Sequence, residues 1–187
     1  MDNDIKKACE IMTQGGVILY PTDTIWGIGC DATNPKAVKR IYEIKHRIDS
    51  KAMIVLVDSM AKVDFYVREI PDTAWNLIEV ADKPLTIIYP NGRNLAENVL
   101  AEDGSIGIRI TQENFSKRLC QQFRKAIVST SANISGQPAP THFKEISEEI
   151  KSAVDYIVTY RQDDTSCAAP SSVIWLGKDG SLKILRP

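Results

Sequence analysis

The chain has 187 residues, a formal net charge of −1 at pH 7 and a pI near 6.1. A chain of this length fits one domain, which can bury a full core without disulfides or a structural metal. Its nearly balanced charge argues against a protein that coats nucleic acid, because such proteins are usually basic overall. We therefore expect a single domain over residues 1–187.

The four cysteines are widely separated, form no CxxC pair and are accompanied by only two histidines. A structural zinc site would need a tighter group of ligands, so we predict free thiols and no metal site. The first residues, Met-Asp-Asn-Asp, lack the apolar segment of a signal peptide, and no apolar run approaches the roughly 20 residues that span a bilayer. We therefore expect a cytoplasmic protein without a membrane contact, in a reducing compartment.

Apolar periodicity and turn residues predict interleaved helices and strands. In chain order they are a helix over 3–14, a strand over 17–20, a helix from Asn34-Pro35, a strand over 53–57 and helices from about 59 and 71. Strands over 85–89 and 106–110 follow, then a helix over 115–123, a strand over 127–130, a helix near 142–152, a strand near 155–159 and a hairpin of 172–176 with 182–185. Because some strands follow each other directly, we predict an α/β fold with a mixed, twisted sheet and helices on both faces.

The segment PTDTIWGIGC (21–30) places two threonines and an aspartate directly after a buried strand. Its two glycines would make a loop in which backbone and hydroxyl groups can approach a ligand. An ordinary turn after a strand explains the same residues equally well.

A basic cluster follows between residues 36 and 51. Six cationic residues stand there against Glu43 and Asp49, a local excess of 6 − 2 = +4: Lys36, Lys39, Arg40, Lys45, Arg47 and Lys51. Cations at a helix end suit a polyphosphate or a carboxylate. Taken alone, the cluster is better explained as a solvated helix end whose charges complement the helix dipole.

Two further segments carry polar residues at unusual places. STSANISG (129–136) offers hydroxyls and an amide that could bind a nucleotide or an amino acid, although a helix cap and turn explain it equally well. Arg109 interrupts the apolar run SIGIRI (105–110), so it must lie at an exposed edge or meet an anion. No GxxxxGK[ST] motif is present, so any ATP site is not a P-loop.

In this order and spacing, seven segments resemble the YrdC family: PTDTIWGIG (21–29), KHRIDSKAMIVLV (45–57), KPLTIIYP (83–90), GIRI (107–110), STSANISG (129–136), PSSVIWL (170–176) and ILRP (184–187). The Lys-x-Arg and Ser-x-Asn pairs of that family fall on Lys45, Arg47, Ser131 and Asn133. The resemblance implies a single-domain member with a YrdC/RibB-like fold, in which the mixed sheet and its helices surround a concave, positively charged cavity.

The resemblance also implies an activity, L-threonylcarbamoyladenylate synthase. This nucleotidyltransferase makes threonylcarbamoyl-AMP and pyrophosphate from L-threonine, bicarbonate and ATP, for N6-threonylcarbamoyladenosine modification of tRNA. ATP is a substrate, and Mg²⁺ would ride on its phosphates without a protein cage. A carbamate oxygen must attack the α-phosphate, so fixed cations that offset the repulsion between two anions should dominate catalysis.

The family's site residues carry over by position. Lys45 and Arg47 are expected to be catalytic, and the expected ATP ligands are Arg47, Lys51, Ser131, Asn133 and Arg186. Threonine is expected to bind Thr24, Arg109 and Ser129, with Arg109 on its carboxylate. The expected partner is the machinery that transfers threonylcarbamoyl to tRNA, with at most a weak contact to tRNA itself.

The sequence departs from the family at several loop positions. Ile48, Ala52 and Thr111 stand where prolines are usual, and Lys83-Pro84 replaces a Pro-Gly-Pro, changes that affect loop rigidity more than charge. Two alternative functions stay open. One is a non-catalytic protein that binds double-stranded RNA or tRNA in translation or ribosome maturation. The other is a carbamoyl-transfer domain like those of hydrogenase-maturation proteins, which use carbamoyl phosphate.

Overall fold

The computed structural model describes residues 1–47, 53–166 and 169–187. The described helices are α1 (Asp2–Thr13), α2 (Pro35–Ile44), α3 (Met60–Tyr66), α4 (Asp72–Val80), α5 (Asn114–Phe123) and α6 (Glu148–Ala153), with 3₁₀ turns η1 (Glu97–Val99) and η2 (Phe143–Glu145). The described strands are β1 (Ile18–Tyr20), β2 (Gly27–Gly29), β3 (Ile54–Val57), β4 (Leu85–Tyr89), β5 (Ile106–Ile110), β6 (Ile127–Ser131), β7 (Tyr156–Ile157), β8 (Ser172–Leu176) and β9 (Leu182–Arg186).

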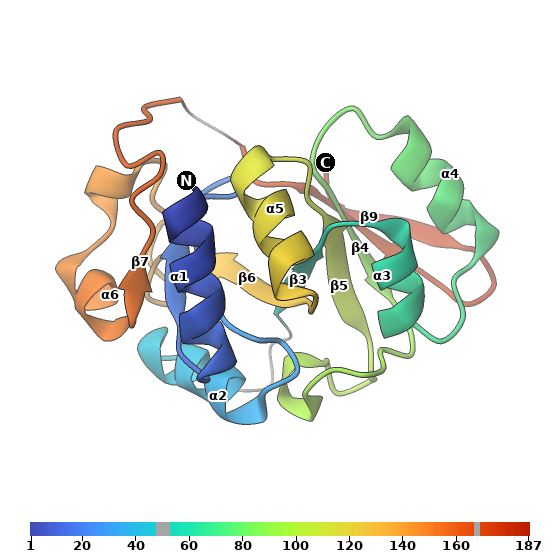
Figure 1. Ribbon diagram of the computed structural model, residues 1–187. Helices are drawn as coiled ribbons and strands as arrows, with labels where there is room; N and C mark the ends of the chain where they lie inside the picture. The colour runs from blue at the N-terminus through green and yellow to red at the C-terminus, as the bar shows by residue number, and fades with distance from the viewer. Residues whose placement is uncertain (48–52, 167–168) are drawn as a thin grey trace.

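Within the described residues the strands form one sheet in the order β7-β1-β2-β6-β3-β5-β4-β8-β9 (Figure 1). The pairs β1–β7, β3–β5 and β4–β8 are parallel. The other neighbouring pairs are antiparallel. The predicted mixed sheet is therefore confirmed.

The two faces of the sheet carry separate apolar clusters, because successive strand residues point to opposite sides. On one face α1 and α5, which lie side by side in Figure 1, cover the strand residues Ile18, Tyr20, Leu56 and Ile127. On the other face α2 and α3 pack against a set that includes Leu19, Ile28, Val55 and Val128. Helices cover both faces, as predicted.

The interpretation of residues 21–30 as a loop is wrong for Gly27–Gly29, which form β2 between β1 and β6. A Cβ at Gly29 would lie 2.6 Å from both the ring of Tyr20 and the carbonyl oxygen of Val128. Close packing therefore demands glycine here, although glycine is depleted in strands. The predicted helix near 142–152 is also divided, into η2 and α6, and the strand near 155–159 is limited to Tyr156–Ile157.

Helix α2 delivers the Lys-x-Arg pair to the inside of the molecule. The Asn34 side chain caps its start, accepting hydrogen bonds from the backbone of Lys36 and Ala37 at 3.0 and 3.3 Å. After Ile44 the chain turns through His46, whose φ of 48° lies in the left-handed region. Lys45 itself keeps helical backbone angles and continues the buried face of α2 that carries Val38 and Ile41, so its side chain points into the protein rather than into solvent.

The described cysteines, Cys9, Cys30 and Cys120, are free thiols, and Cys167 lies outside the described residues. Among the described residues, no group of three or more His, Cys, Asp or Glu side chains is placed to hold a metal ion. No helix in the described part of the chain has the length and apolar content that crossing a bilayer requires.

Candidate functional site

A cavity of about 270 Å³ opens on the face of the sheet that α1 and α5 cover only in part. Strand register places Ile54, Arg109 and Ser129 on the same face as Leu56 and Ile127. Six of the predicted site residues line the cavity: Thr24, Arg47, Arg109, Ser129, Ser131 and Arg186. They come from segments far apart in the sequence. Three arginines and a set of hydroxyls therefore converge on one space.

Arg109 meets an anion, which resolves the choice that its sequence left open. Its Nε lies 3.1 Å from Oδ1 of Asp23, and the two side chains are only 3% and 9% exposed. Burial lowers the pKa of Arg109 and raises that of Asp23, while the attraction between them opposes both shifts. The contact is an ion pair without hydrogen-bond geometry, and it places the carboxylate of Asp23 beside the Nε edge of the guanidinium.

Lys45 is almost fully buried, with 2% of its surface exposed. Its Nζ donates hydrogen bonds to the carbonyl oxygens of Ser131 and Asn133, the latter at 2.7 Å. Burial, reinforced by the neighbouring charge of Arg47, lowers the pKa of Lys45 to about 8. The explanation of this lysine as part of a solvated helix end is therefore wrong. Lys45 joins the Lys-x-Arg turn to the backbone of the Ser-x-Asn segment. It is not one of the described residues that line the cavity.

Arg47 and Asn133, the second members of the Lys-x-Arg and Ser-x-Asn pairs, line two adjoining cavities. Arg47 lines the cavity, with its guanidinium carbon 6.0 Å from the centre of the Tyr42 ring, and burial lowers its pKa. Asn133 lines an adjoining cavity of about 210 Å³ that shares Ala139 with the first. The expected ATP ligand Lys51 lies outside the described residues, as do Ile48 and Ala52.

Arg186 reaches the cavity from β9 and is held in place by Ser171, which directly precedes β8. Its Nε donates to the carbonyl oxygen of Ser171 at 2.7 Å, and its Nη2 donates to the hydroxyl of Ser171 at 3.3 Å. That hydroxyl shares a second hydrogen bond, 2.8 Å long, with the buried hydroxyl of Thr86. Ser171 and Asp23 were not among the predicted site residues, although a polar residue beside an apolar strand was a usable signal for both.

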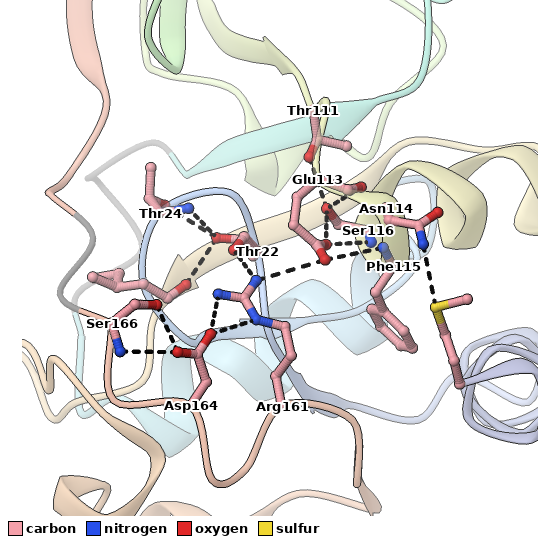
Figure 2. A network of polar contacts seen from close by, with 12 residues as sticks. Thr22, Thr24, Thr111, Glu113, Asn114, Phe115, Ser116, Arg161, Asp164 and Ser166 are labelled. Carbon is pink, nitrogen blue, oxygen red and sulfur yellow. Dashed lines mark hydrogen bonds and ion pairs between the residues drawn. The ribbon is translucent and has the colours of Figure 1, made fainter.

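A polar network fixes the Thr22–Thr24 segment (Figure 2). The Thr22 hydroxyl accepts from the Thr24 backbone at 3.1 Å and donates to the Ile25 carbonyl at 2.8 Å. Arg161 supports the same segment, because its Nη1 donates to the Thr22 carbonyl at 3.3 Å. Sequence reasoning gave Arg161 no role, since it lies outside every motif.

Fold, cavity and paired motifs define a member of the Sua5/YciO/YrdC family. The sequence matches that family, described as "Telomere recombination", over residues 10–187, and the chain belongs to it. The resemblance found in the sequence is thus confirmed. The chain is 34% identical to a threonylcarbamoyl-AMP synthase of Pseudoalteromonas translucida, with 82% of this chain and 84% of that protein covered.

Solved structures agree with this assignment. A Sua5 variant from P. abyssi superposes with a TM-score of 0.86 and 27% identity, and P. abyssi Sua5 complexed with L-threonine with 0.83 and 26%. Each comparison covers 98% of this chain and 53% of the other. The chain therefore spans about half the length of those P. abyssi proteins.

Proposed function

We propose that the chain is an L-threonylcarbamoyladenylate synthase, a nucleotidyltransferase working as one domain over residues 1–187. It joins L-threonine, bicarbonate and ATP to form threonylcarbamoyl-AMP and releases pyrophosphate. The threonylcarbamoyl-AMP then serves the modification of tRNA. The observation that carries the proposal is the convergence of Arg47, Arg109 and Arg186 with the hydroxyls of Thr24 and Ser129 on one cavity. A relative named for this activity and a structural neighbour solved with L-threonine support it.

The reaction brings two anions together, a carbamate and the polyphosphate of ATP. Coulomb repulsion between them weakens when fixed cations lie close to both, and such cations act most strongly where water is excluded. Arg47 and Arg186 line the cavity on different elements, so both can meet the phosphates, and Lys51 is proposed to add a third charge. The adjoining cavity at Asn133 extends the space available to a nucleotide.

Mg²⁺ is proposed to reach the site on the phosphates of ATP. The described residues that line the cavity offer hydroxyls and guanidinium groups but no carboxylate. Mg²⁺ prefers oxygen ligands and usually keeps substrate phosphates and waters among them, so this lining fits a metal that the nucleotide carries. The bound ion would neutralise part of the phosphate charge, and the arginines would orient the chain of phosphates.

Threonine is proposed to lie on the Thr24 side of the cavity. Arg109 lines the cavity and can pair with its carboxylate through the Nη groups, since Asp23 lies beside the Nε edge. The hydroxyls of Thr24 and Ser129 can then recognise the substrate hydroxyl. Lys45 contributes by holding the backbone of Ser131 and Asn133, so its proposed catalytic part is the geometry of this wall.

The non-catalytic RNA-binding alternative has less support. Of the six cations between residues 36 and 51, Lys45 is buried with its amine bound to backbone carbonyls, so it is not available to a phosphate backbone. The test is release of pyrophosphate from ATP with threonine or bicarbonate left out in turn. Release that requires both substrates supports the synthase, and release that requires neither contradicts it. Carbamoyl phosphate in place of bicarbonate tests the carbamoyl-transfer alternative.

A further inference from the structure

The connection between β7 and β8 crosses most of the sheet. β7 is at one end of the strand order and β8 is next to last at the other end (Figure 1). The chain leaves β7 along β1, where the backbone of Val158 donates to the Leu19 carbonyl at 2.9 Å. It reaches β8 through Pro170 and Ser171, which line the cavity. The first half of this connection therefore lies against the segment that carries Thr24.

Arg161 holds that first half in place. Its Nε donates to Oδ2 of Asp164 at 2.8 Å, and its Nη1 donates to the Thr22 carbonyl at 3.3 Å. The same Nη1 lies 3.6 Å from Oε1 of Glu113. Figure 2 shows the guanidinium between these groups, which come from three separate segments. One planar group thus joins the connection, the Thr22 backbone and the start of α5.

Two of the three partners of Arg161, Glu113 and Asp164, are fixed by other contacts. Glu113 caps α5, accepting from the backbone of Phe115 and Ser116 at 3.0 and 2.8 Å. Asp164 accepts from the backbone of Ser166 at 2.9 Å. Because Glu113 and Asp164 do not depend on Arg161 for their own positions, they anchor the guanidinium, which can then hold its third partner, the Thr22 carbonyl, in place.

The backbone at Arg161 has an unusual conformation for a residue other than glycine. Its φ of 66° lies in the left-handed region, which disfavours every residue with a Cβ relative to glycine. Arg124, the residue that ends α5, has nearly the same φ of 64°. Its side chain is exposed, and among the described residues its guanidinium makes no ion pair or hydrogen bond. The chain therefore offers two arginines with nearly the same φ, one in contact with the Thr22 segment and one not.

We propose that Arg161 is a positioning residue for the threonine side of the cavity. By holding the Thr22 carbonyl, it fixes the turn in which the Thr22 hydroxyl binds the Thr24 backbone, and so it places Thr24 in the cavity wall. This inference rests on the proposed function, in which Thr24 contacts threonine.

The nucleotide side does not depend on this contact. Arg186 is held by Ser171, and Ser171 by Thr86, through hydrogen bonds that do not involve Arg161. Arg47 stands after α2, at a separate part of the wall. Loss of Arg161 should therefore weaken the binding of threonine far more than the binding of ATP.

The test compares Arg161→Gly with Arg124→Gly. Both variants relieve a left-handed backbone and both remove an arginine, so effects of charge and chain entropy are matched. For Arg161→Gly we expect the threonine KM to rise roughly five- to tenfold, and the threonine Kd from calorimetry to rise equally. This is about the loss of affinity that one lost hydrogen bond causes. The ATP KM should change less than about twofold, and Arg124→Gly should leave both substrates unchanged.

Arg161→Lys keeps the positive charge but lacks the planar guanidinium, so it cannot contact all of the acceptors at once. We therefore expect a threonine KM between those of the wild type and Arg161→Gly. It also carries the test if the glycine variant does not fold. An unchanged threonine KM, or equal rises in the KM of threonine and ATP, would overturn the proposal. Wild-type protein that binds no threonine would instead overturn the proposed function, so the two failures are distinct.

Discussion

Replacing Lys45 by Met tests whether this lysine is a buried structural cation. Methionine keeps most of the volume of the side chain and removes the amine. The carbonyls of Ser131 and Asn133 would lose their donor, which costs about 1–3 kcal/mol for buried groups. Against this, the variant avoids the desolvation cost of burying the ammonium group, since only 2% of Lys45 is exposed. The two effects oppose each other, and pH separates them.

The magnitude follows from the shift in the pKa of Lys45, from 10.5 to about 8. At 1.36 kcal/mol per unit, keeping the ammonium in the folded state costs roughly 3 kcal/mol at neutral pH. Between the folded and unfolded pKa values the unfolded state binds more protons, so stability increases as pH rises through this window. From pH 7 to pH 9 this one group should add about 1.3 kcal/mol to the free energy of unfolding.

The assay is urea unfolding of wild type and Lys45→Met at pH 7 and pH 9. Burial raises the pKa values of Cys30 and Cys120, which lowers stability over the same range, but both proteins contain them. The difference between the proteins isolates Lys45, and it should move by about 1 kcal/mol in favour of wild type at the higher pH. Lys39→Met is the control, since that side chain is 67% exposed, and its difference should not change with pH. A pH-independent difference for Lys45→Met would refute the buried-cation account.

Three further predictions concern function. Arg47→Ala should lower the rate of pyrophosphate release by two to three orders of magnitude, on the order of the effect of one lost charge stabiliser, whereas Lys39→Ala should not, and an unchanged rate would remove Arg47 from the mechanism. Serine should be a poorer but real substrate and valine nearly inert, because a site that binds a hydroxyl can reject its analogue by as much as ~10⁴; equal turnover of valine would contradict a pocket that recognises the hydroxyl. Binding of tRNA should be weak at physiological salt, with a log–log salt slope of roughly −3 for three or four phosphate contacts, and ATP should compete with it; tight binding that ATP leaves unchanged would restore the RNA-binding alternative.

Much of the fold could be predicted because the apolar pattern is strong where burial is strong. The strands at 85–89 and 106–110 are confirmed with their predicted bounds, and Asn34 with Pro35 marks the start of α2. β2 was missed because Gly27 and Gly29 have low strand propensity. Their place in the sheet is imposed by Tyr20 and Val128 on neighbouring strands, a tertiary requirement that no local pattern contains.

The site shows the same division. The residues of the two sequence pairs could be named from the family resemblance, but their surroundings could not. Lys45 stands among other cations at a helix end, and its contact with the backbone of the Ser-x-Asn segment arises because the fold brings that segment against the buried face of α2. Arg161 contacts Thr22, and Asp23 contacts Arg109, across long separations in the sequence. These partners come together only when the sheet is assembled.

The most direct test of the account is the origin of the carbon that joins threonine to the nucleotide. The purified protein would be incubated with ATP, L-threonine and bicarbonate labelled with carbon-13, and the nucleotide products analysed by mass spectrometry. The account predicts a mixed anhydride of AMP and the threonine carbamate, whose mass includes threonine and one labelled carbon, formed in step with pyrophosphate. It should be absent when threonine is omitted and strongly reduced in Arg47→Ala. Pyrophosphate released without the labelled anhydride would contradict the central claim that this cavity joins a threonine carbamate to the α-phosphate of ATP.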